Sequence, residues 1–252
     1  MKKKNKFFIF VLTLFWGVCL SAFANDYAYR VHTPDNLTSV AKNISKAQND
    51  DNIIFIVDFS NSMNETINGK TKVEMARETL AELVPKIPAN IRVGLRVYGH
   101  RAGFTYLQGC QASTLAVPLG HNNFQTILGS LYATQATGWT PITYSLKQAI
   151  NNDFVGVKGK KHIILLTDGG ENCDESPCTY VINLMKTRDD FKIDVIAFDV
   201  HDIEANNQLK CTALMTSGKF MSAYSQEDLS NSLFESVGID KEVRGTIKIP
   251  KQ

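Results

Sequence analysis

Five oxygen-bearing side chains, in three short segments, are the residues of this sequence best suited to chemistry. Asp58, Ser60 and Ser62 alternate along one segment, Thr140 precedes a proline, and Asp168 precedes two glycines. Carboxylate and hydroxyl oxygens, with no imidazole or thiolate among them, suit Mg²⁺, Mn²⁺ or Ca²⁺ better than zinc or copper. The sequence therefore predicts an all-oxygen site for one divalent cation, and Mg²⁺ is the first expectation.

Each segment also has an ordinary structural interpretation. Asp and Ser are common in turns, and an Asp followed by two glycines can simply close a turn. Thr140 and Pro141 suit the N-cap and the first position of a helix, because Thr accepts a backbone hydrogen bond there and proline needs no amide partner. The metal interpretation therefore depends on whether the fold brings the three segments together.

The surrounding elements predict that convergence. Residues 53–57 and 162–166 are nearly continuous apolar runs, which are typical of strands buried on both faces of a parallel sheet. Further strands are expected at 91–97, 115–119, 193–197 and 219–223, and helical spacing occurs at 73–84, 142–150, 180–185 and 229–237. This alternation predicts a doubly wound α/β fold, in which ligands bind at the carboxyl ends of the strands.

The pattern of Asp58-x-Ser60-x-Ser62, then Thr140, then Asp168 resembles the complete metal-ion-dependent adhesion site (MIDAS) of von Willebrand factor A domains. The resemblance covers residues 51–238 and is strongest to secreted bacterial members. It implies a three-layer α/β/α, Rossmann-like sheet, mostly parallel with one antiparallel edge strand. It also implies that Ser60 and Ser62 coordinate the metal directly, that Asp58 acts mostly through water, and that Thr140 and Asp168 exchange direct and water-mediated roles.

The amino terminus predicts export. Lys2, Lys3, Lys4 and Lys6 precede an apolar run at 7–20, and Ala22-Phe23-Ala24 provides a signal-peptidase site. An uncleaved membrane anchor is the alternative, but the run is short for a span of about 20 residues. We expect cleavage after Ala24, no membrane span in the mature chain, and a periplasmic or extracellular location. The mature chain would comprise a polar leader at 25–50, the domain at 51–238 and a tail at 239–252.

Removal of the signal peptide also removes the basic charge of the chain. The full chain has 27 Lys and Arg against 25 Asp and Glu, and four of the lysines lie in the signal peptide. The mature chain then has 23 basic against 25 acidic residues, a net charge of −2. This balance excludes nucleic-acid binding as a leading function.

The mature chain contains Cys110, Cys173, Cys178 and Cys211. An even number of cysteines in an exported protein predicts two disulfides, for which three pairings are possible. We expect Cys110–Cys173, because both residues follow strands that end at the ligand edge, and therefore Cys178–Cys211. A zinc site is the weaker alternative, because Cys173 and Cys178 do not form a C-x-x-C pair.

Three other residues are candidates for partner contact. Trp139 and Gly169 neighbour predicted ligands, and His100 follows a predicted strand. Each also has a structural interpretation: the tryptophan could pack the loop, and a single histidine usually hydrogen-bonds locally.

These observations predict an exported protein-binding module, not an enzyme. Its divalent cation would capture an Asp or Glu carboxylate of a protein partner, in adhesion or envelope assembly. The alternative is a metal-dependent phosphohydrolase with Asp58 as nucleophile. Such enzymes of the haloacid dehalogenase type carry a second Asp two residues later as general acid, and Ser60 is a poor substitute.

Overall fold

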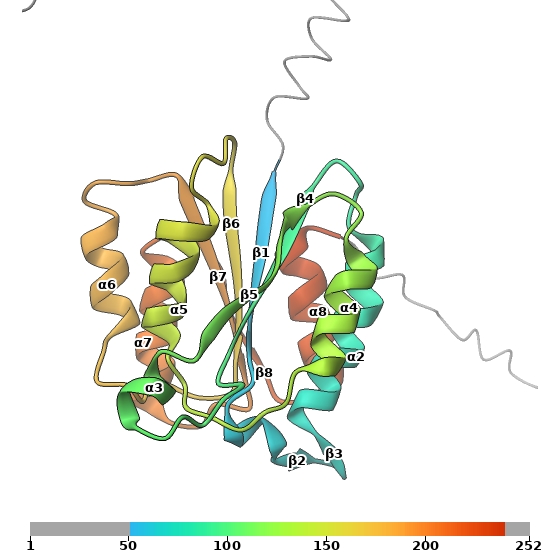
Figure 1. Cartoon of the computed structure of the whole chain (residues 1–252), viewed down its shortest axis with the longest axis vertical. Helices are drawn as coiled ribbons and strands as arrows, with labels where there is room; N and C mark the ends of the chain where they lie inside the picture. The colour runs from blue at the N-terminus through green and yellow to red at the C-terminus, as the bar shows by residue number, and fades with distance from the viewer. Residues whose placement is uncertain (1–50, 240–252) are drawn as a thin grey trace, which may run out of the picture.

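The computed structural model of this chain describes residues 51–239. The predicted signal peptide, leader and tail from residue 240 onward lie outside this range. The described residues form a sheet of order β5-β4-β1-β6-β7-β8 (Figure 1). Neighbouring strands are parallel except β4 and β5. The strands are β1 (Asn52–Asp58), β4 (Arg92–Tyr98), β5 (Ser113–Gly120), β6 (Lys161–Thr167), β7 (Phe191–Phe198) and β8 (Phe220–Ala223).

Helices cover both faces of the sheet, as Figure 1 shows. One face carries α2 (Lys72–Leu83), α4 (Phe124–Ala133) and α8 (Gln226–Val237). The other carries α5 (Ile142–Gln148), α6 (Pro177–Leu184) and α7 (Ile203–Leu214). The shorter elements are η1 (Asn61–Asn64), β2 (Thr66–Ile67), β3 (Lys70–Thr71), η2 (Val84–Lys86), α3 (Tyr106–Cys110) and η3 (Ala149–Asp153). The predicted three-layer fold, with one antiparallel edge strand, is confirmed.

The apolar runs explain why β1 lies in the middle. Its alternate side chains point to opposite faces, so Phe55 packs with the α2, α4 and α8 layer and Ile54 with the α5, α6 and α7 layer. Both side chains are at most 1% exposed. Strand β6 is buried in the same two-sided way, with Ile163 and Ile164 on opposite faces. These two central strands hold the segments that carry Asp58 and Asp168.

Two long helices were not expected from the sequence pattern. In α7, Leu209 and Ala213 are the buried apolar residues, and the rest of the helix is mostly polar. In α4, only Ile127 and Leu131 are buried. Helix α7 has weak apolar periodicity, and its position is decided by packing on the sheet. Helix α4 does carry helical spacing at Phe124, Ile127, Leu128 and Leu131, which pack on the core, so the sequence contains a signal for this helix.

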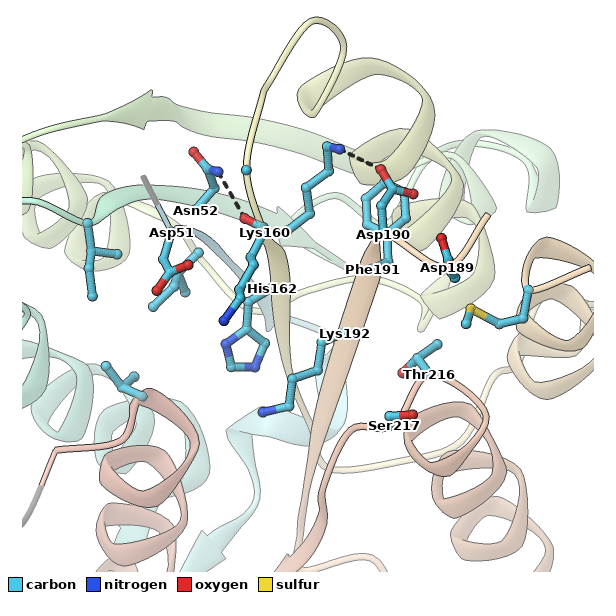
Figure 2. A pocket seen from close by; sticks show the side chains of 16 residues that line it. Asp51, Asn52, Lys160, His162, Asp189, Asp190, Phe191, Lys192, Thr216 and Ser217 are labelled. Carbon is cyan, nitrogen blue, oxygen red and sulfur yellow. Dashed lines mark hydrogen bonds and ion pairs between the residues drawn. The ribbon is translucent and has the colours of Figure 1, made fainter. Parts of the chain in front are cut away.

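The amino ends and the carboxyl ends of the parallel strands carry different features. A cavity of about 600 Å³ lies at the amino ends of the parallel strands, where Asn52, His162 and Lys192 contribute to its lining (Figure 2). The predicted metal ligands lie at the carboxyl ends, so this cavity is separate from them. No helix within residues 51–239 is long and apolar enough to cross a membrane.

Candidate metal centre

Parallel pairing of the central strands brings the two predicted carboxylate ligands to one edge. Asp58 is the last residue of β1, Asp168 directly follows β6, and β1 pairs with β6 in register. Ser60 and Ser62 continue from Asp58 into η1, and Thr140 precedes α5. The short turns after β1 and β6 therefore place Asp58, Ser60, Ser62 and Asp168 at the carboxyl ends of the strands, and the Thr140 loop, which follows α4, joins them through a bridge between Gly138 and Ser60.

Asp58 is fully buried and held by three hydrogen-bond donors. Its Oδ1 accepts the backbone N–H of Ser60 at 2.6 Å. Its Oδ2 accepts the hydroxyls of Tyr98 and Thr167, each at 2.8 Å. Both hydroxyl donors end strands beside β1, so the carboxylate has a fixed orientation before any ligand arrives.

A chain of hydroxyls connects the first segment to the third. Ser60 Oγ and Ser62 Oγ lie 3.0 Å apart, and the Ser62 hydroxyl donates to Asp168 Oδ1 at 2.8 Å. Ser60 and Asp168 are buried, with 2% and 6% exposure. Three of the five predicted ligands are thus directly connected by hydrogen bonds, across a sequence separation of 106 residues.

The two buried carboxylates, Asp58 and Asp168, have too little positive charge around them to offset their burial. Burial raises the pKa of Asp58, although hydrogen bonds from Ser60, Tyr98 and Thr167 oppose the shift. Burial, and then the charge of Asp58, raise the pKa of Asp168 to about 7, against opposing contacts with Ser62 and Lys72. A cation bound beside such a pair would favour the ionised form of both carboxylates and lower their pKa values.

The donor set therefore fits a divalent cation. Within residues 51–239, no group of three His, Cys, Asp or Glu side chains could hold a metal. A site here has to use hydroxyls beside two carboxylates, which is hard-cation chemistry.

Thr140 is not the N-cap of α5. The N-cap of α5 is Pro141, with no side-chain cap hydrogen bond, and the helix begins at Ile142. The interpretation of Thr140 as N-cap and Pro141 as first helical residue is therefore wrong by one position. Instead, the Asn172 side chain accepts the Thr140 backbone N–H at 2.7 Å, which ties this loop to the segment after Asp168.

Close backbone packing holds the first and second segments together. Ser60 and Gly138 form an isolated parallel bridge, and Asn61 donates its N–H to the Gly138 carbonyl at 3.0 Å. Gly99 has φ of +70°, and a Cβ there would lie 2.5 Å from Ser60 N. Only glycine fits at that position.

The expected disulfide pairing is confirmed. Cys110–Cys173 has its Cα atoms 5.5 Å apart, and Cys178–Cys211 has them 5.4 Å apart. The first disulfide ties α3 to the segment after Asp168. The second joins α6 to α7.

The three candidate contact residues have different surroundings. Trp139 is 39% exposed and packs edge-on against Tyr106, with ring centroids 5.3 Å apart. His100 Nε2 hydrogen-bonds Thr114 on β5 at 3.1 Å, which matches the local structural interpretation. Gly169 has open space where a Cβ would project. Trp139 belongs to an exposed group that we call the apolar ledge: Phe104, Tyr106, Leu107 and Trp139.

Sequence reasoning missed one charged residue of the site. Lys72, the first residue of α2, is 3% exposed and pairs with Asp168 Oδ2 at 3.2 Å. Burial would lower the pKa of Lys72, but Glu65 and Asp168 raise it above its ordinary value. No sequence motif marks this lysine, because its contact depends on where α2 packs.

Comparison with known proteins places this chain in a family. A family model of the von Willebrand factor type A domain matches residues 52–236. The uncharacterized protein YwmC of Bacillus subtilis (strain 168) is 29% identical over 231 residues, which cover 90% of this chain and 94% of YwmC.

Solved structures show the same fold. A von Willebrand factor type A protein from Catenulispora acidiphila is 18% identical with a TM-score of 0.60, over 75% of this chain and 42% of that chain. Proximal thread matrix protein 1 of the mussel byssus, with a zinc-occupied MIDAS motif, is 19% identical with a TM-score of 0.57, over 80% of this chain and 50% of that chain. This chain thus spans half or less of these solved chains. The family-model match shows that the chain belongs to the von Willebrand factor type A domain family.

Proposed function

We propose that this protein is an exported binding module that captures a partner carboxylate through one divalent cation. Von Willebrand factor A domains are metal-dependent protein-interaction modules, and the model of this family matches most of the chain. The proposed ligands are Asp58, Ser60, Ser62, Thr140 and Asp168. Adhesion or envelope assembly is the proposed setting.

The observation that carries the proposal is the linked pair of buried carboxylates. Asp58 and Asp168 both have raised pKa values, and a hydroxyl chain joins Ser60 and Ser62 to Asp168. Support for metal binding comes from the mussel byssus protein, whose MIDAS motif holds zinc. We propose Mg²⁺ for this chain, with Mn²⁺ and Ca²⁺ as alternatives, because hard oxygen donors prefer hard cations.

The roles of the residues follow from their contacts. Ser60 and Ser62 lie next to each other and would present their hydroxyl oxygens to the ion. Asp58, held by Tyr98 and Thr167, would supply fixed negative charge behind them. A bound divalent cation supplies a positive centre that the partner's Asp or Glu can complete.

The apolar ledge is the proposed contact surface beside the ion. Trp139 directly precedes Thr140, and its ring lies over Gly109, where a Cβ would come within 2.3 Å of Trp139 Cδ1. Exposed aromatic residues on a rigid support are typical anchors of protein interfaces. A partner segment with a large apolar residue near its acidic residue would suit this surface; His100 and Gly169 remain proposed neighbours.

Metal titration tests the site. Calorimetry with Mg²⁺, Mn²⁺, Ca²⁺ and Zn²⁺ is expected to show saturable one-site binding by the protein and loss of at least about tenfold in affinity in Ser62→Ala or Asp168→Asn. Ser222→Ala, at an exposed position of β8, is the matched control. Equal affinities in all four proteins would contradict the proposed ligands.

Carboxylate capture needs a second experiment. Displayed peptides that bind the protein in Mg²⁺ would be selected, and each acidic residue of the selected peptides replaced by Asn or Gln. We expect binding to require one carboxylate and to disappear in chelator. Binding that persists in chelator would overturn the metal-bridged mechanism.

Export is tested by intact mass. When the full-length gene is expressed in a bacterium, the protein from the periplasm or medium is expected to begin at Asn25 and to carry two disulfides. Retention of residues 1–24 in that protein would contradict the proposed cleavage. The phosphohydrolase alternative has no support from the fold or the relatives, and we do not propose it.

A further inference from the structure

A buried lysine ammonium lies against the proposed metal centre. Lys72 Nζ is 3.2 Å from Asp168 Oδ2, 2.8 Å from Glu65 Oε2 and 3.2 Å from Asp199 Oδ2. The Lys72 side chain is 4% exposed, whereas the side chains of Glu65 and Asp199 are 67% and 23% exposed. The contact with the fully buried Asp168 side chain is therefore the one least screened by water.

Because of this contact, the two carboxylate oxygens of Asp168 have different partners. Oδ1 accepts the Ser62 hydroxyl, and Oδ2 faces the Lys72 ammonium. Lys72 begins α2, and its side chain is buried among three carboxylates, so the ammonium is held beside Asp168. The carboxylate thus keeps one oxygen toward the serine hydroxyls and the other toward a fixed positive charge.

We propose that Lys72 is a positioning residue that sets how tightly this centre holds its divalent cation. This role rests on the function proposed above, and Lys72 has two effects. Its ammonium orients Asp168, and its charge repels a second cation nearby. The centre then holds its ion less tightly but leaves it more strongly positive toward a partner carboxylate.

The structure provides a test with changes of opposite sign. Lys72→Met removes the repelling charge, so Mn²⁺ affinity measured by calorimetry should rise about tenfold. Asp199→Asn removes a carboxylate that offsets Lys72, so the affinity should fall severalfold. Asn suits position 199 because its φ is +60°. Lys72→Arg keeps the charge and should remain within about threefold of the original protein.

Thermal melting supplies a readout that does not depend on a partner. Lys72→Met should lower the melting temperature of the chelated protein, and Mn²⁺ should raise that temperature more in the variant than in the original protein. A purely structural role would lower stability without raising affinity. Lys70→Met, which removes a partly exposed lysine paired with Glu78, is the matched control and should change neither quantity appreciably.

The outcomes separate this inference from the proposed function. If the original protein binds Mn²⁺ and Lys72→Met binds it equally or less tightly, the role of Lys72 is overturned and the metal centre stands. If Lys72→Met fails to fold, an unchanged or raised affinity in Asp199→Asn overturns the inference in its place. If neither the original protein nor any variant binds metal, both proposals are overturned.

Discussion

Two hydroxyl groups, together with the backbone N–H of Ser60, orient the Asp58 carboxylate. Tyr98 and Thr167 approach the same oxygen from the two strands that flank β1. Neither residue belongs to the proposed ligand set, and both are fully buried. The proposed metal centre therefore depends on hydrogen bonds from the sheet itself as well as on the loops.

Removing the Tyr98 hydroxyl should weaken this support. Tyr98→Phe keeps the ring in the core but deletes one donor to a buried carboxylate, which typically costs about 1.5–3 kcal/mol. We expect a lower free energy of unfolding in urea and a severalfold weaker Mn²⁺ affinity by calorimetry. Tyr132→Phe, at a side chain that is 57% exposed, is the control. Identical behaviour of the two variants would show that the hydroxyl contributes nothing.

Replacing Trp139 should weaken partner binding without changing metal affinity. Trp139→Ala removes the exposed ring beside Tyr106, and the loss of such an anchor commonly costs about 2 kcal/mol in binding. We expect a selected acidic peptide to bind more than about tenfold more weakly while Mn²⁺ affinity stays unchanged. Tyr224→Ala, at another exposed aromatic side chain, should leave peptide binding intact. Equal peptide affinities would remove the apolar ledge from the interface.

At the level of elements, the two disulfides should have separable effects. Cys178–Cys211 joins α6 to α7, away from the hydroxyl chain, and its serine double variant should lose about 3 kcal/mol of stability with unchanged Mn²⁺ affinity. Cys110–Cys173 joins α3, which supports Trp139, to the segment after Asp168. Its loss should also weaken peptide binding, because the ledge would have to be ordered on binding.

Urea unfolding and peptide titration on both double variants check this contrast. The contrast fails if losing either disulfide weakens peptide binding equally. It also fails if the two double variants have the same stability in urea and the same peptide affinity.

The same elements show what the sequence could and could not predict. The central strands β1 and β6 were predicted because their sequences are apolar runs, and β4 and β7 because apolar residues alternate in their sequences. In the fold, β4 and β7 are nevertheless buried along almost their whole length. Helix α7 was missed because it buries few apolar side chains, whereas α4 was missed although its apolar residues recur at helical spacing. Lys72 was missed for a different reason: its contact with Asp168 spans 96 residues and exists only after α2 has packed.

Across the whole molecule, another buried carboxylate, Asp194, connects elements toward the amino ends of the strands. Asp194 on β7 is fully buried and lies 3.0 Å from both His162 Nε2 and Lys192 Nζ. It also accepts the Lys219 N–H at 2.8 Å and the Ser236 hydroxyl at 2.7 Å. Asp194 thus links β6, the segment before β8, and α8, and two of its partners, His162 and Lys192, line the cavity in Figure 2.

Burial would raise the pKa of Asp194, but contacts with His162, the Lys219 N–H and Ser236 outweigh burial and lower it below its ordinary value. A carboxylate with a lowered folded-state pKa stabilises the fold above its unfolded-state pKa of about 3.9. That contribution is lost as the pH falls through the folded-state value. The fold should therefore weaken in acid partly through this one residue, although Asp194 is far along the strand from the proposed metal centre.

Asp194→Asn should show this dependence directly. At pH 7 the variant loses the ion pair with Lys192 but keeps an oxygen acceptor, so we expect its free energy of unfolding to fall by about 2 kcal/mol. Below a pH of about 4 the deficit should shrink, because Asp194 takes up a proton in the unfolded chain of the original protein while it stays charged in the fold, and this uptake stabilises the unfolded state. Urea unfolding between pH 3 and pH 7 measures both proteins, with Asp189→Asn, at an exposed residue lining the same cavity, as control. A deficit that stays constant down to pH 3 would mean that shape and hydrogen bonding, rather than charge, make Asp194 stabilising.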